Sequence, residues 1–145
     1  MTRPLVVDAN VVTKWLIPED GTPEALALRE NRTFAAPSLL FAEVSNILWK
    51  KVSRRQVLLG EAMDALSVLR HLDIDIYSDS DLYEDACRLS IEIDHPAYDC
   101  FYLITAARLD TLLVTADEKL VRKLANAHSL EWSAMVVSLK HMLDR

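Results

Sequence analysis

The sequence is short of the residues that organise several classes of protein. Its 145 residues include only two cysteines, Cys87 and Cys100, and two glycines. A disulfide framework needs more cysteines and an oxidising compartment, so we expect both thiols to be reduced and buried. The chain also lacks repeats, low-complexity segments and an obvious linker. It is therefore predicted to form one domain over residues 1–145, long enough to bury a substantial core.

Long apolar runs are missing as well. Only Leu5-Val6-Val7 separates Pro4 from Asp8, and no later run approaches the roughly 18 residues of a membrane span. We therefore expect no signal peptide and no membrane segment, and a soluble protein of the cytoplasm.

Positive charge is scarce. Sixteen Lys and Arg stand against 22 Asp and Glu, which gives a net charge of -6. Such a chain repels nucleic acid overall, so a polyanion would need a local basic patch or a bound metal. The basic residues that could contact a phosphate backbone are Lys14, Lys50, Arg54 and Lys119. For Lys50 and Arg54 a solvated helix end is the simpler interpretation, and both interpretations stay open.

Strand and helix signals alternate along the chain. Strands are predicted at residues 5–7, 73–77, 112–115 and 130–132. Helices are predicted at residues 22–30, 39–52, 60–71, from 81 onward, 98–109 and 117–126, and the stretch 134–143 fits either. Strands separated by helices predict the α/β class, with one parallel sheet covered by helices on both faces.

Four acidic residues lie where a core would be expected. Asp8 and Asp117 come just after predicted strands, Asp99 lies near a helix start, and Glu43 lies beside the apolar stripe of a predicted helix. Sites of open α/β sheets form outside the carboxyl ends of the strands. We therefore expect these four carboxylates to meet in one crevice at that edge.

The chemistry of such a cluster favours a hard cation. Neighbouring carboxylates repel one another, and some would take up protons without compensation. Mg²⁺ and Mn²⁺ prefer oxygen ligands and can activate water for phosphodiester cleavage. No His or Cys ligand spacing accompanies the acids, which argues against zinc. The cluster therefore indicates a Mg²⁺ or Mn²⁺ site.

Ordinary structural roles compete with this interpretation. Asp8 could cap a strand end, Asp117 could be a helix N-cap, and Asp99 could complement a helix dipole. Asn46 and Thr115 could orient the acids, or be ordinary polar packing. For Asp8, Asp117 or Asp99 alone the structural role is at least as good. Glu43 is the hardest of the four to explain in this way, although water or an ion pair could account for it, and the four together favour the site.

Neighbouring residues have similar alternatives. The aromatic side chains Tyr98, Phe101 and Tyr102 are predicted to be core rather than platforms for stacked bases. His95 is interpreted as a helix-end residue rather than a catalyst.

Four segments carry a resemblance to a known family. They are Val7 to Asn10, Leu40 to Asn46, Ala97 to Tyr102 and Val114 to Asp117, which lie in this order over nearly the whole chain. Together they resemble the PIN domain, and more closely the VapC-type toxins of bacterial and archaeal toxin-antitoxin pairs. The resemblance implies a PIN-like three-layer α/β/α fold with a central parallel sheet of about four to five strands.

The resemblance also implies a function. It implies an endoribonuclease that depends on Mg²⁺ or Mn²⁺ and cleaves RNA, with Asp8, Glu43, Asp99 and Asp117 as the acids of the metal site. It further implies a homodimer and a cognate antitoxin protein that covers the site. Asn10 stands where the family often carries Ser or Thr, and its amide can still orient a metal-bound water.

Two other functions stay open. A receiver-like signalling domain also places acids, a Thr and a Lys at strand ends, but its acidic pair usually stands together after the first strand. Here Asp8 is followed by Ala9-Asn10. The other alternative is a PIN-type interaction module without activity, which the presence of all four acids disfavours.

Overall fold

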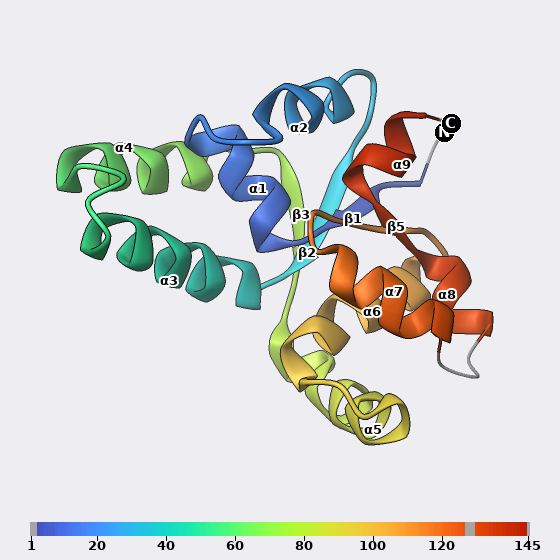
Figure 1. Cartoon of the computed structure of the whole chain (residues 1–145). Helices are drawn as coiled ribbons and strands as arrows, with labels where there is room; N and C mark the ends of the chain where they lie inside the picture. The colour runs from blue at the N-terminus through green and yellow to red at the C-terminus, as the bar shows by residue number, and fades with distance from the viewer. Residues whose placement is uncertain (1–2, 127–129, 145) are drawn as a thin grey trace.

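Short apolar segments of the chain form the strands of one central sheet. The computed structural model describes residues 3–126 and 130–144 (Figure 1). The strands are β1 (Leu5–Val7), β2 (Phe34–Pro37), β3 (Ile74–Tyr77), β4 (Leu113–Thr115) and β5 (Val136–Ser138). They pair in the order β3-β2-β1-β4-β5, and every pairing is parallel. The predicted parallel sheet of about four to five strands is therefore confirmed.

Helices cover both faces of the sheet. They are α1 (Ala9–Leu16), α2 (Thr22–Leu28), α3 (Leu39–Ser53), α4 (Leu59–Arg70), α5 (Tyr83–Ile93), α6 (Ala97–Leu109), α7 (Glu118–Asn126), α8 (Leu130–Met135) and α9 (Leu139–Leu143), with a 3-10 turn, η1 (Asp79–Asp81). Helix α6 packs against β1, β2 and β4, whereas α1 packs against α2, α3 and β4. Figure 1 shows α3 and α4 as a hairpin at one side of the molecule. This is the predicted three-layer α/β/α architecture.

The burial of the strands follows from their place in the sheet. Val6, Val7 and Val114, in the adjacent strands β1 and β4, are fully buried, as expected for parallel strands covered on both faces. The edge strand β3 is mostly exposed. The alternation of apolar and polar residues correctly predicted a strand here, but the strand is only partly covered by the rest of the protein. Within the described residues, no helix combines the length and apolar character that crossing a membrane requires.

Three local predictions were wrong or incomplete. Residues 130–132 begin helix α8, and the strand at this end is β5, whose paired valines suit a buried strand better. Strand β2 was missed because Phe-Ala-Ala-Pro has weak strand propensity, and its burial between β1 and β3 decides its conformation. Cys100 is buried as predicted, but Cys87 is exposed on α5.

Candidate active site

Three of the four predicted acids line one cavity beyond the carboxyl end of β1. Asp8 directly follows β1 and is the N-cap of α1, Glu43 lies in the second turn of α3, and Asp99 lies in the first turn of α6. The cavity has a volume of about 520 Å³. Its other lining residues are Ala9, Asn10, Leu39, Ala42, Asn46, Ile47, Lys50 and Tyr98. Elements far apart in the sequence therefore bring three carboxylates to one space.

Asp8 is the most deeply buried of these acids. It is 8% exposed, and burial raises the pKa of its carboxyl from 3.8 to about 6. The nearby charges of Asp99 and Glu43 add to the rise. The backbone N–H of Val11 (3.0 Å) and the hydroxyl of Thr115 donate hydrogen bonds to the carboxylate and oppose the rise. The fold thus holds an acid whose negative charge is poorly compensated.

The charged form of Glu43 is also disfavoured by its surroundings. Burial raises the pKa of its carboxyl, and the charges of Asp99 and Asp79 raise it further. The hydroxyl of Tyr102 lies close enough to lower that pKa in part. This hydroxyl is buried and makes no hydrogen bond of ordinary geometry to any described residue, so we regard it as a neighbour rather than a bonded partner. Burial in turn raises the pKa of Tyr102 well above its usual range.

Asp99 is held by a histidine one turn before it. The Nε2 atom of His95 lies 2.6 Å from Oδ2 of Asp99, and because a carboxylate only accepts, Nε2–H is the donor. The Nδ1 atom of His95 is buried and has no partner among the described residues. The contact fixes one oxygen of Asp99, and the other accepts no hydrogen bond from the part of the chain that the structure describes.

The fourth acid, Asp117, lies apart from this cavity. Its carboxylate accepts a hydrogen bond from the backbone N–H of Lys119 (2.9 Å) and so caps α7. Its own N–H donates to Thr115 Oγ1 (2.9 Å), whose hydroxyl donates to Asp8. Asp117 is therefore linked to the acidic cavity through Thr115, but its carboxylate does not line the cavity. Its role as a metal ligand stays a prediction.

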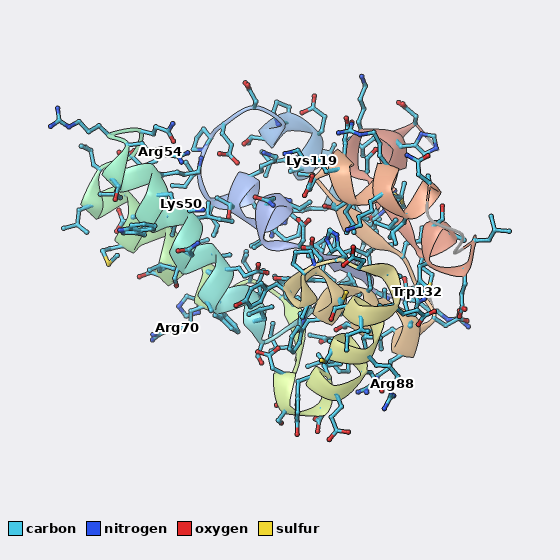
Figure 2. The ribbon with its side chains drawn as sticks, turned by 60° about the horizontal axis from the view of Figure 1, so that its bottom comes forward. Lys50, Arg54, Arg70, Arg88, Lys119 and Trp132 are labelled. Atoms are coloured by element: carbon cyan, nitrogen blue, oxygen red, sulfur yellow. The ribbon has the colours of Figure 1, made fainter. Side chains whose placement is uncertain are left out.

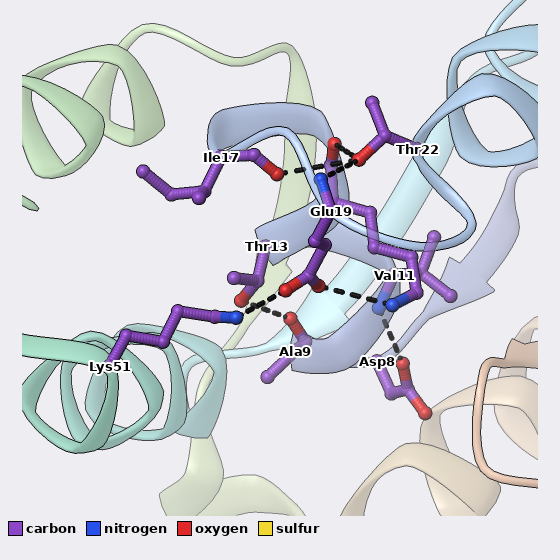
Figure 3. A network of polar contacts seen from close by, with 9 residues as sticks. Asp8, Ala9, Val11, Thr13, Ile17, Glu19, Thr22 and Lys51 are labelled. Carbon is purple, nitrogen blue, oxygen red and sulfur yellow. Dashed lines mark hydrogen bonds and ion pairs between the residues drawn. The ribbon is translucent and has the colours of Figure 1, made fainter. Parts of the chain in front are cut away.

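Of the basic residues predicted to contact RNA, only Lys50 lines this cavity. Lys50 lines the cavity, and Arg54 follows at the end of α3 (Figure 2). Figure 2 shows Lys119 on the α7 side of the molecule. Lys14 forms an ion pair with Glu19 (3.1 Å), which also pairs with Lys51 of α3 (Figure 3). The Glu19 pairs hold α1 and α3 together, and Lys14 lines a different cavity.

Comparison with known proteins identifies the family. The PIN domain model matches residues 5–126. This chain belongs to the PIN domain family. PIN domains are generally nucleases that use divalent metal ions.

Two solved structures have a similar fold. The crystal structure of PAE2754 from Pyrobaculum aerophilum has a TM-score of 0.71 and 22% identity, over 100% of this chain and 97% of that one. A toxin-antitoxin complex from Klebsiella pneumoniae has a TM-score of 0.60 and 18% identity, over 93% of this chain and 97% of that one. No curated protein matches the chain.

The donor set of this PIN domain suits Mg²⁺ or Mn²⁺. The acids supply oxygen ligands, the amides of Asn10 and Asn46 can orient bound water, and a cation would offset the burial that raises the pKa of Asp8. Across residues 3–126 and 130–144, no three His, Cys, Asp or Glu side chains are already gathered tightly enough to hold a metal. The acids face one cavity and need side-chain adjustment to converge on an ion.

Sequence reasoning missed one acid near the site. The Oδ1 atom of Asp79 accepts a hydrogen bond from the N–H of Leu39 (3.0 Å), and its own N–H donates to Ser38 Oγ (3.0 Å). Asp79 thereby caps α3 from the end of β3 and adds negative charge near Glu43. No local pattern reveals this contact, because it joins residues 40 positions apart.

Proposed function

We propose that this PIN domain is an endoribonuclease that cleaves RNA with the help of bound Mg²⁺ or Mn²⁺. One observation carries the proposal: three carboxylates, from the residue after β1 and from α3 and α6, line a single cavity, and burial leaves Asp8 with a pKa of about 6. Three carboxylates around one cavity, one of them deeply buried, suit a divalent cation.

Each residue of the cavity has a role in this proposal. Asp8, Glu43 and Asp99 would hold the ion, which when bound supplies an activated water and stabilises the leaving oxygen. Thr115 keeps Asp8 in place through its hydroxyl. The amides of Asn10 and Asn46 would orient water, and Lys50 would hold the RNA backbone. None of the ion pairs in the described part of the chain involves Lys50, so its ammonium is available.

The biological role we propose is that of a toxin neutralised by a cognate antitoxin. The support is the similarity in fold to a chain of a toxin-antitoxin complex, together with the VapC-like motifs. A homodimer in the cytoplasm is part of this proposal. Expression of the chain should arrest growth, and the Asp8→Asn variant should not. If that variant also arrests growth, the toxicity does not depend on the acidic cavity.

Cleavage of RNA with and without metal tests the enzymatic proposal. We expect purified protein to cut a structured RNA in Mg²⁺ or Mn²⁺ and to stop when the ions are chelated. Full cleavage after chelation would rule out the metal-dependent mechanism. No cleavage under any condition would favour the alternative of an inactive interaction module. Membership of the PIN family leaves a receiver-like domain without support.

His95 is expected to set the metal affinity through Asp99. Replacing it with alanine removes the hydrogen bond to Oδ2 and should weaken Mn²⁺ binding by about 10-fold, because partners of metal ligands typically contribute that much. His95→Gln restores an N–H donor and should recover most of the affinity. Calorimetric titration with Mn²⁺ measures both variants. Equal affinities for wild type and His95→Ala would show that the contact is only structural.

Asp117 is expected to matter less than the acids of the cavity. Asparagine caps a helix about as well as aspartate, so Asp117→Asn keeps the contact with Lys119 and removes only the charge. We expect cleavage to fall by on the order of 10-fold, the scale of a residue that acts near a metal rather than on it. Single-turnover rates measure the change. A loss as large as that for Asp99→Asn would make Asp117 a direct ligand.

A further inference from the structure

An exposed tyrosine stands at the rim of the acidic cavity. Tyr98 lies in the first turn of α6, next to Asp99, and lines the same cavity. It is 63% exposed, whereas Tyr102, one turn further along α6, is 1% exposed. The prediction that both are core is therefore right for Tyr102 and wrong for Tyr98. Packing does not account for the position of the Tyr98 ring.

The hydroxyl of Tyr98 does not account for it either. Within residues 3–126 and 130–144, the side chain of Tyr98 makes no hydrogen bond. The side chain of Tyr83, which is also exposed, does contact Glu84. The exposed face of the ring is thus an apolar, flat surface beside carboxylates and the ammonium of Lys50. A ligand suited to both features carries a flat π-system and a negatively charged backbone. Nucleotides combine the two.

We infer that Tyr98 is a stacking platform for one unpaired nucleobase next to the cleaved phosphate. This inference rests on the proposed ribonuclease function and assigns the side chain that binds one base of its substrate. Aromatic side chains bind the faces of unpaired bases, whereas bases inside a helix already stack on their neighbours. Lys50 in the same cavity would hold the adjoining phosphate.

The test combines a protein change with a substrate change. Tyr98→Ala should raise KM for a short single-stranded RNA by on the order of 10-fold, the usual scale for losing one stacked base, with kcat nearly unchanged. Tyr98→Phe keeps the ring and should recover most of the KM that Tyr98→Ala loses. Tyr83→Ala is the matched control, because Tyr83 is also exposed (54%) and does not line the cavity.

An abasic substrate identifies the stacked base. Removing the base at one position beside the cut site should raise KM of the wild-type enzyme by the same factor, and should have no further effect on Tyr98→Ala. If wild type cleaves RNA and Tyr98→Ala has an unchanged KM, the stacking inference is overturned and the ribonuclease proposal stands. The stacking inference is also overturned if the two losses multiply. If wild type does not cleave RNA at all, both proposals are overturned.

Discussion

Asp99→Asn should lower the rate of RNA cleavage by about 10³-fold or more, since a catalytic metal contributes several kcal/mol to the transition state. Asparagine has nearly the same shape as aspartate and still offers an oxygen to Nε2–H of His95. The substitution therefore removes the negative charge at the cavity while keeping the local contact. Single-turnover cleavage in saturating Mg²⁺ measures the loss.

The same helix provides the control. Asp110 is the C-cap of α6, is 81% exposed at its side chain and pairs with Arg3 (2.6 Å), and neither residue lines the cavity. Its backbone is left-handed (φ 51°), a conformation that asparagine also tolerates. Asp110→Asn should therefore cleave RNA like wild type. Similar losses in both variants would mean that α6 is simply sensitive to charge, and would remove Asp99 from the active site.

Asp8 should make the metal-free protein less stable as pH rises. Its folded pKa of about 6 lies above the ordinary value of 3.8, so between these values the native state binds more protons than the unfolded state. The free energy of unfolding therefore decreases through that window, by about 3 kcal/mol in total, and the contribution levels off above about pH 7.

The Asp8→Asn variant isolates this contribution. Asparagine cannot ionise, and its weaker contact with Thr115 costs the same at every pH. The stability of the variant relative to wild type should therefore increase by roughly 2.5 kcal/mol from pH 4 to pH 7 in urea unfolding without metal. Saturating Mg²⁺ should reduce the difference at pH 7 by stabilising wild type. If the difference in unfolding free energy between the variant and wild type does not change with pH, burial does not raise the pKa of Asp8 in the folded protein.

The places of Asp8 and Glu43 could be predicted from local patterns. A carboxylate directly after an apolar strand must lie at the edge of the sheet, and Glu43 lies three residues after buried Leu40, beside the apolar stripe of α3. Asp117 could not be assigned in this way, because a helix cap and a metal ligand have the same sequence signature after a strand. Its carboxylate caps α7, and its role as a metal ligand stays a prediction.

Contacts between distant elements were beyond sequence reasoning. The Asp79 cap on α3 depends on β3 ending beside the start of that helix. Tyr98 and Tyr102 share a helical spacing that predicts one common face, yet only Tyr102 is buried. The difference arises because the first turn of α6 borders the cavity, and a periodic pattern does not show where a helix extends past its partners.

Locating Mn²⁺ in a crystal by anomalous scattering tests the metal site most directly. Mn²⁺ stands in for Mg²⁺, which binds carboxylate oxygens at about 2.1 Å. We predict an anomalous peak in the cavity, within that distance of oxygens from Asp8, Glu43 and Asp99, and its absence in Asp99→Asn crystals. A wild-type crystal in saturating Mn²⁺ with no peak among these three carboxylates would contradict the proposed metal site.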